Sequence, residues 1–116
     1  MASVLVIGID PQLVSGMDGA ALRAVLDAEL ARFGEHGIEA AMTLVPFDGS
    51  GEAAVVAALR ERAWDVVVVG GGIRKTEQLV LLFEQTVNLV RRHAPRAAIA
   101  FNSTGGDSVE AAQRWL

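Results

Sequence analysis

Residues 65–75, DVVVVGGGIRK, decide the fold class of this 116-residue chain. The continuous valine run predicts a strand over residues 65–69 that is buried on both faces, as in a parallel sheet covered by helices. Three glycines end this strand, and an apolar helical pattern follows over residues 76–93. A buried strand that leads through a turn into a helix predicts an α/β fold built from such units.

The same pattern recurs on both sides of this stretch. Short apolar runs predict three further strands, over residues 3–9, 38–46 and 97–101, and the weaker pattern of 38–46 suits an edge strand. Helical spacing predicts three more helices. The first lies between Asp18 as N-cap and Gly37 as C-terminal stop, the second covers residues 51–63, and the last runs from Asp107 to the end.

The order βαβαβαβα predicts one α/β domain over residues 1–116: a three-layer, doubly wound sheet of four parallel strands. We prefer strand order 2-1-3-4, as in flavodoxin-like proteins, over the Rossmann-like alternative 3-2-1-4. This likeness concerns topology alone, because the flavodoxin phosphate loop is absent from the sequence.

Composition excludes several classes of function. A net charge of −4 and a pI near 5.0 argue against a nucleic-acid partner. Zero cysteines exclude disulfides, thiolate nucleophiles and zinc-cysteine sites. Residues 1–9 lack a basic leader and are too short for a signal peptide or a membrane span, so we expect a cytoplasmic protein with no membrane partner.

Polar and glycine residues follow three of the predicted strands. Ligands bind to open parallel sheets outside the carboxyl ends of the strands, so we expect these residues to border one crevice. The candidate catalytic residue is Asp10, directly after the first strand. The candidate ligand-binding residues follow the third and fourth strands: Gly70, Gly71, Gly72, Arg74, Lys75, Asn102, Ser103 and Thr104.

Two of these loops could carry charge-dependent chemistry. Asp10 at a half-buried sheet edge could act as a general acid or base, or it could fix the turn with Pro11 or pair with Arg74. Arg74 and Lys75 lie at the start of a predicted helix, where cations oppose the helix dipole. A bound phosphate, carboxylate or sulfate would reverse that penalty, and glycine amides could hold it; alternatively, Arg74 pairs with Asp10 or Glu77.

The remaining polar residues are less specific. Asn102, Ser103 and Thr104 suit either a polar ligand or a turn that caps the last helix, for which Asp107 and Glu110 have capping-box spacing. His36 and His93 are predicted at the opposite edge of the sheet without further metal ligands at suitable spacing, so we predict no metal site. Residues 11–18 could form a lid.

The predicted helix over residues 76–93 has apolar residues around roughly half its circumference, more than a sheet-covering helix needs. We expect part of this surface to form a homodimer; the alternative is a helix wedged centrally within the monomer. Three hypotheses of function follow: a binding domain for a small polar or anionic ligand at the carboxyl edge, a small enzyme that uses Asp10, or a non-catalytic dimeric interaction module. The sequence identifies no cofactor.

Overall fold

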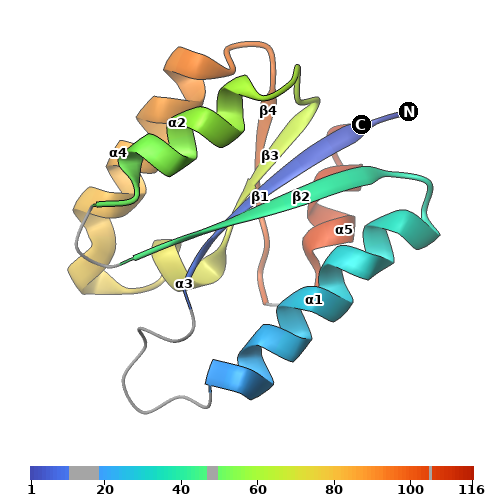
Figure 1. Ribbon diagram of the computed structural model, residues 1–116, viewed down its shortest axis with the longest axis horizontal. Coiled ribbons are helices and arrows are strands. Elements are labelled where there is room, and N and C mark those ends of the chain that lie inside the picture. Colours follow the sequence, from blue (N-terminus) through green and yellow to red (C-terminus); the bar gives the residue numbers. More distant parts are fainter. Residues whose placement is uncertain (11–18, 47–49, 105) are drawn as a thin grey trace.

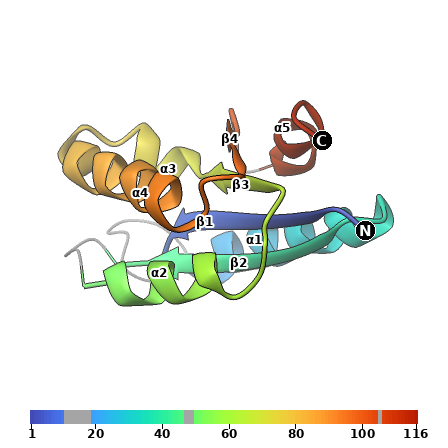
Figure 2. The ribbon, with the colours of Figure 1, turned by 90° about the horizontal axis from the view of Figure 1, so that it is seen from above.

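A computed structural model describes residues 1–10, 19–46, 50–104 and 106–116. It contains a four-stranded, all-parallel sheet in the order β2-β1-β3-β4, which confirms the preferred topology and shows that 3-2-1-4 is wrong. Figure 2 shows the four strands following one another in this order from the bottom to the top of the view. The strands are β1 Ser3–Ile9, β2 Glu39–Val45, β3 Val66–Val69 and β4 Ala98–Phe101.

Helices cover both faces of the sheet, as predicted. In Figure 1, α2 and α4 lie on one side of the strands and α1 and α5 on the other. The helices are α1 Gly19–Glu35, α2 Glu52–Arg60, α3 Gly71–Arg74, the 3₁₀ helix η2 Glu77–Leu79, α4 Val80–His93 and α5 Ser108–Gln113. Within the described part of the chain, no helix is long and apolar enough to cross a bilayer.

Alternate residues of the central strands build two cores. Leu5 and Ile7 of β1 face α2 and α4, where Trp64 joins them, whereas Val4 and Val6 face α1 and α5, where Phe33 joins them. Each such side chain stabilises the fold by about 1.5–3 kcal/mol when it is fully buried. Continuous apolar strands are therefore required here, because both faces of the sheet are covered.

The end of α1 matches its predicted stop signal. Gly37 has a φ of 71°, a left-handed conformation that favours glycine. The Gly37 amide donates to the Gly34 carbonyl at 3.1 Å, and the Ile38 amide donates to the Phe33 carbonyl at 2.9 Å. This pair of bonds is a Schellman motif, which satisfies the last helical carbonyls. The predicted N-cap of this helix, Asp18, lies outside the described residues.

The predicted helix over residues 76–93 is wrong at its start. Helical structure begins earlier, in α3, breaks at Thr76, whose φ of −95° and ψ of 114° are extended, and resumes through η2 into α4. The break lets Ile73 and Leu79 both reach the core beside α2 and α4. The broad apolar surface is only partly used: Leu89 and Val90 are buried, whereas Val80 is 54% exposed and Leu81 is 78% exposed.

Candidate functional site

The candidate residues that follow β1, β3 and β4 lie at the carboxyl edge of the sheet, where α3 lies against the end of β1 (Figure 1). The Gly70 amide donates to the Ile7 carbonyl at 2.8 Å, which fixes the loop after β3 beside β1. The Gly71 amide donates to the Asn102 Oδ1 atom at 2.9 Å, which joins the loop after β4. The Asp10 amide continues the ladder to β2 by donating to the Val45 carbonyl at 2.9 Å. A catalytic role for Asp10 stays a prediction.

The glycines in this edge allow close packing of main chain. A Cβ atom on Gly72 would lie 2.9 Å from the Ile9 Cγ2 atom, and one on Gly70 would lie 3.2 Å from the Ile7 carbonyl oxygen. Neither glycine adopts a positive φ; among the described glycines only Gly37 does. The sequence GGG is therefore used to seat α3 on β1 rather than to make a left-handed turn.

Asn102 is the centre of this edge. Its side chain is buried; Oδ1 accepts from the Gly71 amide, and Nδ2 donates to the Ser108 hydroxyl at 3.1 Å. One side chain thus connects the start of α3 with the start of α5. This arrangement supports the turn-forming alternative for Asn102, because its polar atoms are directed into the protein.

The two cations of this edge donate to main-chain carbonyls. Arg74 donates from Nη2 to the Asn102 carbonyl, and Lys75 donates from Nζ to the Ser103 carbonyl. The Arg74 guanidinium also lies over the Phe101 ring, 5.7 Å from its centroid. These contacts hold both cations next to Asn102. The Arg74 Nε atom, however, is buried and has no hydrogen-bond partner among the described residues.

Asp107 organises the loop after β4. Its carboxylate accepts from the amides of Ser103, at 2.9 Å, and Thr104, at 2.9 Å. Partial burial favours a higher pKa for Asp107, but the hydrogen bonds from Thr104 and Ser103 outweigh it and hold the pKa below its ordinary value. The predicted side-chain cap of α5 is wrong, because this carboxylate turns back to the loop and makes no cap bond to α5.

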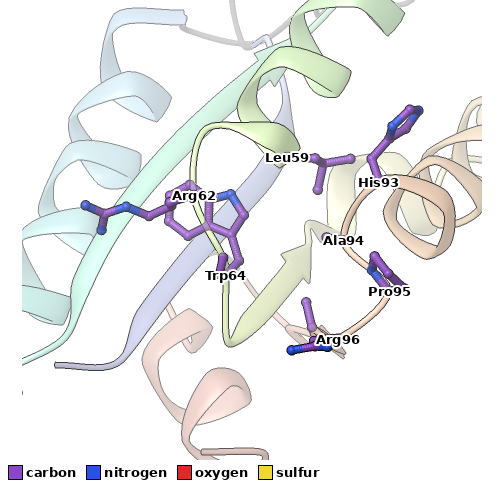
Figure 3. Close-up of a pocket in the computed structure, with 9 residues that line it drawn as sticks. Leu59, Arg62, Trp64, His93, Ala94, Pro95 and Arg96 are labelled. Carbon is purple, nitrogen blue, oxygen red and sulfur yellow. The ribbon is translucent and has the colours of Figure 1, made fainter.

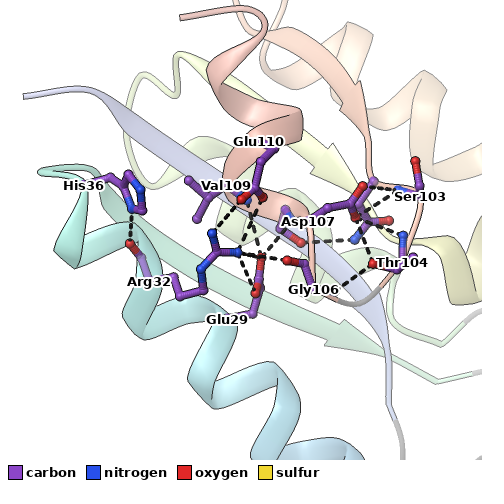
Figure 4. Close-up of polar contacts among 11 residues, drawn as sticks. Glu29, Arg32, His36, Ser103, Thr104, Gly106, Asp107, Val109 and Glu110 are labelled. Carbon is purple, nitrogen blue, oxygen red and sulfur yellow. Dashed lines mark hydrogen bonds and ion pairs between the residues drawn. The ribbon is translucent and has the colours of Figure 1, made fainter.

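Glu29 of α1 supplies the missing cap, which the sequence analysis did not identify (Figure 4). Glu29 is only 4% exposed. Its Oε1 atom accepts hydrogen bonds from the amides of Ser108, at 2.8 Å, and Val109, at 3.5 Å. A carboxylate at the first turn of a helix complements both the unpaired amides and the dipole. The one local signal was an acid at helical spacing among the apolar residues Leu26 and Phe33.

Arg32 neutralises this buried carboxylate and links it to α5. Its guanidinium lies 3.3 Å from Glu29 and 2.5 Å from Glu110, and it donates to the Gly106 carbonyl at 2.8 Å. The hydrogen bond with Glu110 raises the pKa of Arg32, and the same bond lowers the pKa of Glu110. Glu110 therefore pairs with α1 and takes no part in the predicted capping box.

The histidines lie at the amino edge, as predicted. His36 contacts the Arg32 carbonyl through Nδ1 at 2.8 Å, at the end of α1 (Figure 4). His93 ends α4 and lines a cavity with Trp64 and Arg96. Among the described residues, no group of three or more His, Asp or Glu side chains could hold a metal ion.

Comparison with known proteins gives information on the fold alone. No family model and no curated protein sequence matches this chain. A similar solved structure is the crystal structure of a "putative lipoprotein" fragment from Peptoclostridium difficile 630. The match has 15% sequence identity and a TM-score of 0.51, and it covers 87% of this chain and 72% of that chain.

Proposed function

We propose that this protein is a small-molecule binding domain that holds a polar or anionic ligand at the carboxyl edge of its sheet, beside Arg74. The observation that carries the proposal is the buried Arg74 Nε atom without a described partner. A buried donor that lacks a partner costs about 1–3 kcal/mol, and more when it is charged. An oxygen of a bound anion would remove that cost, once the side chains that close Nε off from solvent shift to admit it.

The surroundings of Arg74 suit an anion. Lys75, the sole lysine of the sequence, is the next residue, so two positive charges lie at one point of an otherwise acidic chain. Arginine has five N–H donors, and the Asn102 carbonyl takes one Nη2 contact. The cations are also preorganised, because the Asn102 and Ser103 carbonyls already position them. Preorganisation lowers the entropy lost on binding.

The chemical class of ligand is set by these donors. A guanidinium recognises planar carboxylates and phosphates through two parallel hydrogen bonds, and an ammonium group adds a point charge. Phosphate, sulfate and carboxylate groups on small molecules therefore fit this edge. The glycine spacing matches neither dinucleotide-binding loops nor P-loops, so no nucleotide is singled out.

Isothermal titration against sugar phosphates, nucleotides and carboxylates tests the proposal. Glutamine at position 74 or 75 keeps a donor for the loop carbonyl but removes the charge, so Arg74→Gln and Lys75→Gln should fold. Each should weaken binding by about tenfold, the loss of a charge-assisted contact. The matched control is Arg60→Gln, at an exposed position of α2, and this variant should bind the ligand like the native protein. No binding by the whole panel, or equal affinity in all three variants, would contradict the proposal.

A homodimer formed through α4 is a second proposal, supported by the exposure of Leu81 and Val80. Large adjacent apolar side chains in water favour association. Light scattering should then show a dimer that Leu81→Lys converts to a monomer, whereas Gln78→Lys, on the exposed surface just before α4, leaves it unchanged. A native protein that is monomeric at every soluble concentration would contradict this proposal and with it the dimeric interaction module.

A cytoplasmic location is also a proposal. The absence of cysteine supports it, since proteins of reducing compartments rarely depend on disulfides. Fractionation of cells that express the full-length protein tests it, and recovery outside the cytoplasm would contradict it.

A further inference from the structure

A cavity lies at the opposite edge of the sheet, where β3 and β4 begin (Figure 3). It has a volume of about 260 Å³ and is bounded by the loop before β3, including residues 62–64, and the loop before β4, residues 93–97. No residue of the carboxyl edge takes part in it. Its ligand class can therefore be considered separately from that of Arg74 and Lys75.

The floor of the cavity is apolar and fixed. It is formed by Leu59, Trp64 and Ala94, and Trp64 is only 5% exposed. The Trp64 Nε1 group donates to the Ala58 carbonyl at 2.8 Å, so its one polar atom is already satisfied. Arg62 lies over the ring, 5.4 Å from its centroid, and is held there by Glu39 at 2.6 Å. Ala63, Pro95 and Ala97 complete the apolar part of the lining, which favours an apolar ligand body.

Two arginines and a histidine line the cavity. Arg62, His93 and Arg96 line it, and no Asp or Glu does, in a protein whose net charge is −4. His93 in the last turn of α4 has an ordinary explanation, since cations complement the carbonyl end of a helix. Arg96 lies beyond that helix, and Arg62 belongs to a different loop. Arg62 is paired with Glu39, whereas Arg96 has no ion-pair partner among the described residues, so Arg96 beside an apolar floor favours a ligand with one negative end.

We infer that this cavity binds a small apolar carboxylate, with its ring or branched alkyl body between the loops before β3 and β4 and its carboxylate toward Arg96. A volume just below the usual range of ligand pockets limits the ligand to about ten non-hydrogen atoms. Highly charged ligands such as phosphates are disfavoured here, because the apolar floor would not replace their hydration. The inference stands independently of the proposed function.

Tryptophan fluorescence tests this inference with three probes of graded chemistry. Trp115→Phe removes the exposed second tryptophan, so the signal reports Trp64. Phenylacetate should bind in the high-micromolar to millimolar range, whereas toluene, without the charge, and acetate, without the ring, should each bind at least about fivefold more weakly. NMR shifts of residues 59–64 and 93–97 on addition of phenylacetate should locate the site at this edge.

Two variants in the same background complete the test. Arg96→Gln should weaken phenylacetate binding by about five- to tenfold and leave toluene binding unchanged. Arg92→Gln, at an exposed position of α4 outside the cavity lining, should have little effect on either. Ala63→Leu at the exposed mouth should exclude both probes, with circular dichroism confirming that it folds. Absence of phenylacetate binding, binding indifferent to Ala63→Leu, or shifts confined to the carboxyl edge would each overturn the inference.

Discussion

The two edges of this parallel sheet are closed by different interactions. At the amino edge, the loops before β3 and β4 pack around Trp64 and Leu59. At the carboxyl edge, polar contacts from Asn102, Arg74 and Lys75 join the loops after the same two strands. Apolar packing tolerates an unfilled cavity such as the one beside Trp64, whereas a polar junction needs a partner for every buried donor. The proposed anion site at the carboxyl edge rests on one such donor, the Arg74 Nε atom.

Breaking the apolar edge should have the largest effect on stability. Trp64→Ala removes a buried indole and its hydrogen bond to the Ala58 carbonyl, and it should lower the free energy of unfolding by about 3–5 kcal/mol. Trp115→Ala, which truncates an exposed tryptophan, should change it by less than about 0.5 kcal/mol. Urea unfolding measures both, and equal losses would show that Trp64 does not close this edge.

Breaking the polar edge should lower the free energy of unfolding somewhat less. Asn102→Ala leaves the Gly71 amide without its acceptor, removes the bond to Ser108, and should lower the free energy of unfolding by about 2–4 kcal/mol. Asn88→Ala is the control, because that amide makes a single exposed contact with the Glu84 carbonyl. An Asn102→Ala protein as stable as the Asn88→Ala protein would contradict the central position of Asn102.

A substitution in the contacts that attach α5 next to this edge should have a smaller effect again on stability. Glu29→Gln keeps an acceptor for the Ser108 amide but removes the charge that faces Arg32, and should cost about 1–2 kcal/mol. Hydrogen exchange should quicken mainly in α5, because its first amides lose their anionic cap. Glu35→Gln, at the exposed end of the same helix, should leave exchange in α5 unchanged. Uniform acceleration throughout the chain would contradict a local role.

The smallest expected effect is a dependence on pH. Because the folded pKa of Asp107 lies below the ordinary 3.8, its carboxylate stabilises the fold above the unfolded pKa, and this is lost as pH falls through the folded pKa. Asp107→Asn should therefore be less stable than the native protein at neutral pH, by under about 1 kcal/mol, and the gap should narrow below about pH 4. Urea unfolding at several pH values checks this. A gap that widens in acid would have the wrong sign.

The sheet could be predicted from the sequence because its signals are local. Apolar runs such as residues 66–69 place the strands within about one residue, and Gly37 marks the end of α1. Rules for parallel crossovers predicted the doubly wound sheet and placed Asp10, Gly70 and Asn102 at one edge, but they left two strand orders open, of which the preferred 2-1-3-4 is the one observed.

The errors concern contacts between residues distant in sequence. The capping-box spacing of Asp107 and Glu110 suggested a local cap, but Glu29, separated from Ser108 by 79 positions, takes that place. The short helix α3 was missed because its three glycines predicted only a turn, whereas Ile73 packs in the core with strand residues such as Leu5 and Ile7. The possible lid at residues 11–18 lies outside the described residues.

The most direct test of the central claim observes the Arg74 Nε–H group itself by NMR during titration with inorganic phosphate, sulfate and small carboxylates. If the carboxyl edge holds an anion, this signal should shift and saturate with at least one of these probes, while the Nε–H signal of Arg60 on α2 stays in place. An Arg74 signal that no anion moves, or that moves only in parallel with Arg60, would contradict an anion site at this edge.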